Sequence, residues 1–564
     1  MTVKFDKIID NMENRTLTKN AGKTAFGTFL SRILGYIRDM LVANLFGAGM
    51  FADAFYAAFR IPNLFRRLFG EGSFNAAFIP VFSEYLHTKD KSETQKFLNA
   101  VFTSLFVILA IVSILGMFFA PVLAKLIAWG FTNDPEKMQL TIELTRLMFP
   151  FIMFICLAAF LMGILNTLQS FFIPAFAPSA LSISEIFYML AIAPMLGGGN
   201  QIKGLAISVI AGGALHFIMQ YPKLKALGWH LKLQLKINNE QLIINGNMDS
   251  GFRRNDKEET VNASLLPPPS SLPFYKHPGI KRIWILMIPA IIGLSVDQIN
   301  SFVDTICASF LASGSITALY YSNRVMQLPL AIFGLAFATV SLPALSKACA
   351  VKDMSTYKDS LNHSIRFSVF TLLPAMAGLM VIGLPIIRLL FEHGKFDFAA
   401  SLMTNDALFY YSLGLPAYAL AKIFANAFYA FQDTKTPVKS AAAAMILHVI
   451  LCVILMYPMG VGGLALATAV ASYFNLLLLV IWLKKRLGKI GLKKILFSSV
   501  KSFTGAILTG IAAFYACKIS PSLFISVPFA VISGTAVFLI SAKILKSEEL
   551  GAFMRVFEKS EGCS

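Results

Sequence analysis

Residues 31–71 read SRILGYIRDMLVANLFGAGMFADAFYAAFRIPNLFRRLFGE, and their mixture of apolar and charged side chains decides the fold. The stretch is apolar enough to form membrane spans, yet it carries eight charged residues: Arg32, Arg38, Arg60, Arg66, Arg67, Asp39, Asp53 and Glu71. One arginine at the centre of a lipid-facing helix costs about 2.5–3.5 kcal/mol. These side chains must therefore face water, protein or an anionic ligand, which predicts a polar wall inside a bundle of membrane helices.

Two interpretations of the arginines are open at this point. Arg32 and Asp39 are about two helical turns apart and share one face, and apolar residues continue on both sides of Arg32 and Arg38. This placement favours a cavity that binds an anion. The alternative is that the arginines reach water at helix ends or pair only with nearby carboxylates, which suits Arg66 and Arg67 best.

The composition is that of an integral membrane protein. The chain has 564 residues, of which 56% are hydrophobic, and its formal net charge is +19. A soluble chain could not bury so much apolar surface. The basic residues lie mainly in loops, so the positive-inside rule explains them better than nucleic-acid binding does. The first 23 residues lack an apolar core, so we expect no cleavable signal peptide.

The expected fold class is an all-α polytopic membrane protein with about fourteen transmembrane helices, its basic loops alternating so that both termini are cytoplasmic. The expected spans lie near 25–47, 51–86, 97–129, 140–168, 172–197, 202–222, 281–312, 316–347, 360–391, 402–431, 437–458, 461–484, 495–518 and 522–545. The expected domains are a cytoplasmic N-terminus (1–23), an N-lobe of six spans (24–222), a cytoplasmic linker (223–280), a C-lobe of six spans (281–486), two further spans (487–545) and a cytoplasmic tail (546–564).

The two lobes are expected to be copies of one repeat. Residues 79–90 (IPVFSEYLHTKD) align with 342–353 (LPALSKACAVKD), and Asp39 aligns with Asp304 at nearly the same spacing. Each copy holds an even number of spans, so the copies have the same orientation. Such parallel repeats are related by a pseudo-twofold axis along the membrane normal and place a site between the lobes.

The second half adds charged residues that should extend this site. Arg324 lies in YYSNRVMQLP with apolar residues on both sides, and we expect it to face the cavity opposite Arg32 and Arg38. Further candidates for the polar interior are Glu185, Arg146, Asp297, Asp304, Lys422 and Asp406. For Glu185 and Asp406, a local structural pair is an equally open alternative. His448 is interpreted as a residue that hydrogen-bonds between helices. No phosphate-binding loop, nucleophile elbow or metal-ligand spacing is present, so neither ATP hydrolysis nor enzyme catalysis is expected.

Several motifs resemble one family of membrane transporters. They are SRILGYIRD (31–39), FGAGMFADAF (46–55), PNLFRRLFGEGSF (62–74), AFIPVFSEY (77–85), YYSNRVMQLP (320–329) and QDTKTPVK (432–439). These segments closely resemble the MurJ (MviN) lipid II flippases of the MOP superfamily. The resemblance covers about residues 20 to 545 and excludes the polar insert 228–276.

The resemblance implies a function and a site. It implies two six-helix lobes around a cationic cavity, with the last two helices forming a groove for a lipid tail. It also implies that undecaprenyl-pyrophosphate-linked peptidoglycan precursor, lipid II, moves from the inner to the outer leaflet of the bacterial cytoplasmic membrane by alternating access. The expected substrate-binding residues are Arg32, Arg38, Asp39, Arg60, Arg66 and Arg324. Lipid II, the membrane, and proteins of cell-wall synthesis and division are the expected partners of a monomeric chain.

One ion site of the family is altered in this sequence. Some relatives use sodium, and the matching ligands here would be Asp304 and Thr468. His448 and Cys452 stand where further oxygen ligands are expected, so sodium coupling is doubtful and no other cofactor is expected. One alternative function is a MOP-type exporter of another lipid-linked oligosaccharide or of a small molecule. A basic cavity argues against a cation exporter of this kind. The other alternative is a membrane enzyme that acts on polyprenyl phosphates.

Overall fold

The computed structural model describes residues 24, 26–67, 73–234, 236–237, 272–273, 277–488 and 491–551. Side chains are described for all of these except 236–237, 272–273, 289–297, 336 and 492. The expected N-terminal segment, most of the expected linker and most of the tail therefore lie outside the described residues. So does the side chain of Asp297.

The first half of the chain forms one helical bundle. It begins with a helix over residues 26–46. The elements that follow are α2 (Met50–Phe65), α3 (Phe74–Thr88), α4 (Lys91–Phe118), α5 (Ala120–Ile127), η2 (Trp129–Asn133), α6 (Pro135–Met148), α7 (Phe151–Thr167), α8 (Phe172–Phe176), α9 (Ser179–Phe187), η3 (Tyr188–Ile192), η4 (Ala193–Met195) and α10 (Gly199–Ala226).

The second half forms another bundle, after a short antiparallel pair of strands, β1 (Lys236–Ile237) and β2 (Leu272–Pro273). Its elements are α12 (Pro278–Ser309), α13 (Ser315–Pro329), η7 (Leu330–Gly334), α14 (Leu335–Ala350), α15 (Met354–Phe391), α16 (Phe398–Leu413), α17 (Leu415–Ala430), α18 (Lys435–Leu487), α19 (Leu492–Cys517) and α20 (Leu523–Ile544). Helix α18 is broken at Gly460, whose φ is 55°. Because a 53-residue helix would be far longer than a bilayer core of about 30 Å, this break separates two spans.

Helix starts and bends follow local sequence rules. Asp134 accepts a hydrogen bond from the Lys137 backbone N–H, and Pro135 occupies the first turn of α6. Asp353 caps α15 in the same way, and hydrogen bonds from Thr356 and Ser355 lower the pKa of its carboxyl to about 2.

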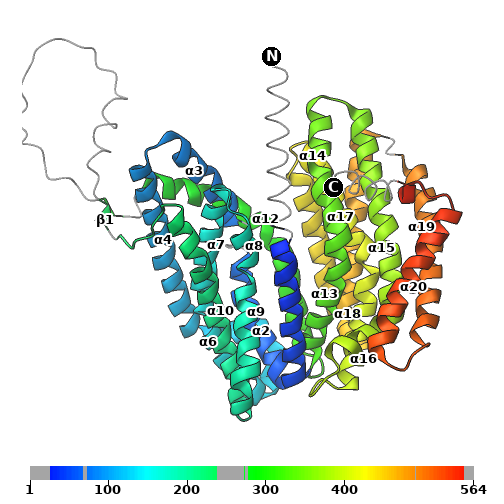
Figure 1. Ribbon diagram of the computed structural model, residues 1–564, viewed down its shortest axis with the longest axis horizontal. Coiled ribbons are helices and arrows are strands. Elements are labelled where there is room, and N and C mark those ends of the chain that lie inside the picture. The colour runs from blue at the N-terminus through cyan, green and yellow to red at the C-terminus, as the bar shows by residue number, and fades with distance from the viewer. Residues whose placement is uncertain are drawn as a thin grey trace, which may run out of the picture.

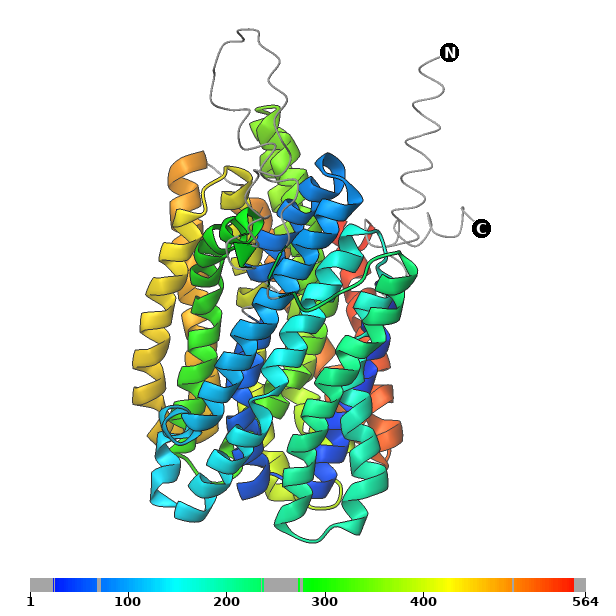
Figure 2. The same ribbon diagram turned by 90° about the vertical axis from the view of Figure 1, so that its left-hand side faces the viewer.

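The two bundles lie side by side, with cavities between them. Figure 1 shows that they approach each other near α2 and α16 and lean apart toward the ends of α3 and α14. Seen at right angles to this view, the helices of both bundles run roughly parallel to one another (Figure 2). At the narrow end the Lys395 backbone N–H donates to the Asn44 carbonyl at 2.9 Å. The space between the bundles is therefore closed at that end by contacts between the halves.

The expected fold class is confirmed at the level of an all-helical polytopic membrane protein. Within the described residues, eight helices are long and apolar enough to cross a membrane, or nine if the bent pair α16 and α17 forms one span. Every expected span coincides with helical residues, although 68–72, inside the second, lie outside the described part.

Candidate functional site

A buried carboxylate joins the two halves at the centre of the molecule. The Asp39 side chain is 1% exposed. Its Oδ1 accepts from Nε and Nη2 of Arg38 at 2.9 and 2.6 Å, and its Oδ2 accepts from Nε of Arg324 at 2.9 Å. Asp39 and Arg38 lie in the first helix and Arg324 lies in α13. One aspartate therefore orients two arginines that the sequence places 286 residues apart.

Further contacts hold these two guanidinium groups. Nη1 of Arg38 lies 3.8 Å from Glu185, and Nη2 donates to the Tyr320 hydroxyl at 3.2 Å. The guanidinium of Arg324 lies over the ring of Tyr36, 5.2 Å from its centroid. The face of an aromatic ring attracts a cation, so this stacking helps to hold the Arg324 guanidinium in place. Both arginines are thus positioned before any ligand arrives.

The remaining expected arginines differ in how they are held. Arg60 donates from Nε to the Thr305 hydroxyl and from Nη1 to the Ser301 hydroxyl, both at 2.9 Å. Arg66 donates from Nε to Asn63 at 2.9 Å. Arg32 has no hydrogen bond or ion pair within the part of the chain that the structure describes.

These arginines surround a cavity of about 570 Å³ between the bundles. Its lining includes six arginines and one acidic residue: Arg32, Arg38, Arg60, Arg66, Arg67, Arg324 and Asp304. A second cavity of about 780 Å³ continues from it, sharing Arg32, Arg324 and Asp304 and adding Lys422 and Thr468. The lining of the space is strongly basic.

The structure separates the expected substrate-binding residues into two groups. The five arginines line the cavity, whereas Asp39 lies behind them and holds two of them. Arg67, assigned above to a helix end, also lines the cavity. Sequence reasoning missed His216 on α10, a buried lining residue, because a lone histidine in an apolar helix carries no spacing signal.

Two other expectations need correction or adjustment. Arg146 does not join the polar interior; it is exposed, and its Nε points to the Met117 carbonyl at 3.4 Å. Arg146 lies near the end of α6, where its guanidinium can reach water. Asp406 accepts a hydrogen bond from the Gly462 backbone and forms a local contact outside both cavities.

A second buried carboxylate closes the narrow end. Asp53 on α2, 1% exposed, lies 2.8 Å from Nζ of Lys137 on α6. It also accepts from the backbone N–H groups of Gly314 and Thr317 at 2.7 and 2.9 Å, and from the Thr317 hydroxyl at 2.7 Å. Gly314 has a φ of 96°, and a Cβ there would meet the Ala48 carbonyl at 2.7 Å. Helix α2 is thereby tied to the start of α13.

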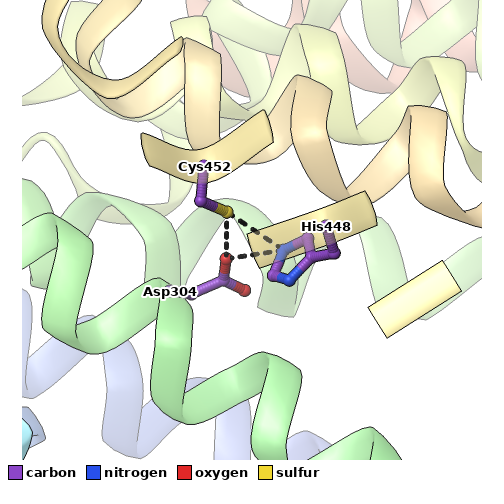
Figure 3. Close-up of side chains that lie close together, drawn as sticks. All are labelled: Asp304, His448 and Cys452. Carbon is purple, nitrogen blue, oxygen red and sulfur yellow. Dashed lines mark hydrogen bonds and ion pairs between the residues drawn. The ribbon is translucent and has the colours of Figure 1, made fainter. Parts of the chain in front are cut away.

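The altered ion site is a compact cluster of mixed donors. Figure 3 shows Asp304 from α12 facing His448 and Cys452 from α18. The His448 Nε2 lies 3.1 Å from Asp304 Oδ1, 3.3 Å from Cys452 Sγ and 3.2 Å from the Thr468 hydroxyl. Sodium, a hard cation, prefers oxygen donors. A nitrogen and a sulfur stand between the two expected oxygens, so these residues do not fit sodium.

The arrangement of the helical bundles is similar to the fold of solved transporters of the MOP superfamily. A solved multidrug-resistance MATE transporter of that superfamily, in an inward-facing conformation, matches the fold with a TM-score of 0.62 at 12% identity, covering 82% of this chain and 95% of that one.

The family follows from closer relatives. The lipid II flippase MurJ family profile matches residues 42–534. The lipid II flippase MurJ of Burkholderia cenocepacia is 36% identical over 459 residues, 81% of this chain and 82% of that protein. The probable lipid II flippase MurJ of Rickettsia prowazekii is 33% identical over 467 residues, 82% of this chain and 83% of that protein. A solved lipid II flippase MurJ in an inward closed conformation has a TM-score of 0.72 at 28% identity, covering 92% of this chain and 98% of that one. This chain belongs to the lipid II flippase MurJ family and is a transporter.

Proposed function

We propose that this protein moves lipid II, the undecaprenyl-pyrophosphate-linked peptidoglycan precursor, from the inner to the outer leaflet of the bacterial cytoplasmic membrane. The observation that carries the proposal is the cavity between the bundles, where six arginines face one acidic residue. Guanidinium groups bind phosphate oxygens bidentately, and the pyrophosphate is the anionic part of this lipid.

The arginines have separate roles in this proposal. Asp39 occupies Nε of Arg324 and both Nε and Nη2 of Arg38. The two Nη groups of Arg324 remain to donate to the pyrophosphate, whereas Nη1 of Arg38 lies 3.8 Å from Glu185 and would be shared between this carboxylate and the ligand. Arg32, which has no partner among the described residues, contributes a full charge. Arg60 and Arg66 would bind the rest of the head group from α2 and its C-terminal end.

A glycine lies against the Arg324 guanidinium. A Cβ at Gly35 would meet Nη2 of Arg324 at 2.5 Å, so a larger residue at position 35 would displace this guanidinium from its present position.

The proposed architecture has fourteen spans, in two six-helix lobes and two C-terminal helices. Tyr56 and Tyr321, which align in the two repeats, hydrogen-bond to each other at 3.0 Å. A contact between equivalent residues is expected where a pseudo-twofold axis passes between the lobes. Helices α19 and α20 pack against α15 and carry exposed apolar side chains such as Leu496 and Phe503, which suits a groove for the lipid tail.

The arrangement supports alternating access. The Asp53 network holds the lobes together at one end, and the space between them widens toward the ends of α3 and α14, beside the basic loops expected to be cytoplasmic. The structure therefore corresponds, in this proposal, to a state that receives the head group from the cytoplasm. A monomer stays the expected state. Cell-wall synthesis and division proteins stay expected partners.

Genetic replacement tests the proposal. Cells depleted of their own flippase would express this protein, and lipid II exposed on the outer leaflet would be measured. Restored exposure and growth are expected. Normal membrane insertion without lipid II exposure, together with export of another lipid-linked oligosaccharide, would favour the alternative exporter instead.

A further inference from the structure

We propose that Asp304, His448 and Cys452 form a binding site for a zinc-class divalent cation in place of the sodium site of some relatives. The donor atoms all lie within 4.8 Å of one another. Imidazole and thiolate are the donors that zinc-class ions prefer, and a carboxylate is an accepted third ligand. The proposal goes beyond the proposed function and does not depend on it.

The helix geometry brings these donors together without strain. His448 and Cys452 are four residues apart on α18, so their side chains share one helix face. Asp304 projects toward them from α12 (Figure 3). Asp304 and Cys307 are three residues apart on α12, and the Cys307 thiol is a neighbour of Cys452. Cys307 is therefore placed as an outer-shell partner of the Cys452 sulfur.

The donor separations match a tetrahedral ion. Zinc bond lengths to sulfur, nitrogen and oxygen place neighbouring donor atoms about 3.3–3.6 Å apart in a tetrahedron. The separations here are 3.1 Å from His448 Nε2 to Asp304 Oδ1, 3.3 Å from Nε2 to Cys452 Sγ and 3.7 Å from Sγ to Oδ1. Three donors therefore define one face of a tetrahedron of suitable size.

The ring nitrogen Nε2 of His448 is the centre of the cluster. His448 is completely buried, and Asp304, Cys452 and Thr468 all lie within 3.3 Å of Nε2. A neutral imidazole nitrogen offers one proton or one lone pair, so it bonds to one of these neighbours at a time. A divalent cation bound by Nε2, Oδ1 and a Cys452 thiolate would bind three of the converging donors at once and leave the group without net charge.

The fourth position and the entry path lie on the cavity side. Asp304 and Thr468 both line the second cavity, so an ion can enter from water and be completed by the Thr468 hydroxyl or by water. The bound ion would fasten α12 to α18. Because Ser301 and Thr305 on α12 hold Arg60, the same ion would fix the wall that presents this arginine.

Cobalt spectroscopy on the purified full-length protein tests the site. Protein treated with a chelator would be titrated with Co²⁺, whose thiolate complexes show a charge-transfer band and whose tetrahedral complexes show strong visible bands. One equivalent is expected to produce both, and Zn²⁺ is expected to abolish them. Cys452→Ser should remove the charge-transfer band. Cys307→Ser should keep it while weakening binding roughly tenfold, and Cys156→Ser, a buried cysteine on α7, should change nothing.

Thermal unfolding without and with each ion gives a second readout. Zn²⁺ is expected to raise the melting temperature of the parent protein and of Cys156→Ser, but not of Cys452→Ser or His448→Gln. A folded parent protein without the cobalt–thiolate band would overturn the proposal, and this outcome needs no variant. Stabilisation by Na⁺ instead would indicate an oxygen site. A pH-dependent melting temperature that His448→Gln abolishes, with no metal effect, would indicate a protonated His448–Asp304 pair. None of these measurements uses transport, so a failure here leaves the proposed function standing.

Discussion

At the scale of single residues, the arginines of the site differ in how many partners hold their side chains. Arg38 and Arg324 share the buried Asp39, whereas Arg32 has no partner among the described residues. Substitutions should therefore separate binding from stability. Removing Arg32 deletes a charge that only a ligand would use, and removing Arg324 also leaves Asp39 with one partner fewer.

We predict that Arg32→Ala, Arg38→Ala and Arg324→Ala each abolish complementation while the protein still inserts. A hydrogen bond to a charged group contributes about 1.5–3 kcal/mol, so losing even one guanidinium donor costs roughly tenfold or more in binding. Lipid II exposure and membrane levels would be measured together. Arg146→Ala is the matched control, because this arginine is exposed and outside the cavity. Normal growth with any two of the three removed would contradict the clamp.

A residue of the site could be predicted from the sequence when its charge differed from the apolar residues around it. Charged residues inside apolar runs stood out, and so five of the six arginines that line the cavity were predicted as substrate-binding residues. The part played by Asp39 was not, because its contact with Arg324 crosses between lobes. The grouping of His448 and Cys452 with Asp304 was not predicted as a set of metal ligands, because it depends on how α12 packs against α18.

At the scale of elements, the length of the apolar runs predicted where the helices lie. The break at Gly460 coincides with the expected loop between the eleventh and twelfth spans. The contact between α2 and α13 was not predicted. Asp53 lies beside a glycine-rich turn, where an acidic residue is usually exposed to solvent and has no structural role. Its four partners come from α6 and from the start of α13.

We predict that Asp53→Ala destabilises the folded protein by about 3–5 kcal/mol, since it leaves the Lys137 ammonium buried without its counter-charge. Adding Lys137→Met should recover part of this loss. Unfolding in detergent would measure both free energies. Glu143→Gln is the control, because the Glu143–Lys203 pair is exposed and worth at most about 1 kcal/mol. Equal losses from Asp53→Ala and Glu143→Gln would show that the narrow end is not held by this network.

The expected linker leads to a prediction at the same scale. Deleting residues 240–265, which lie outside the described part of the chain, should leave transport intact. Their sequence is polar and does not follow the membrane pattern, so no apolar packing is lost. Complementation by the deleted protein would be compared with that of the full chain at equal expression. Loss of activity at normal membrane levels would show that the insert has a role in transport.

At the scale of the whole molecule, the basic cavity couples the proposed cycle to the membrane potential. A pyrophosphate diester carries about two negative charges, and each charge crossing 100 mV is worth about 2.3 kcal/mol. With the cell interior negative, outward movement of the head group is favoured by roughly 4–5 kcal/mol per 100 mV when no cation moves with it. The arginines of the empty cavity are drawn toward the negative interior, so the potential also favours the return to the inward-facing state. Both halves of the cycle therefore run in the same direction.

We therefore predict that collapsing the membrane potential stops flipping, while replacing sodium with potassium at constant potential changes little. Neither an ATP-binding motif nor an oxygen-ligand sodium site is needed to drive the cycle, because the cavity charge and the lipid charge supply the coupling. Lipid II exposure would be measured with an ionophore that removes only the potential, and separately after sodium is withdrawn. If sodium withdrawal alone halts export, then Asp304 and Thr468 bind sodium despite the intervening His448 and Cys452, and the potential is not the driving force. If both treatments leave export unchanged, the net charge of the loaded cavity does not cross the membrane, and the cycle must be driven by consumption of lipid II on the outer face.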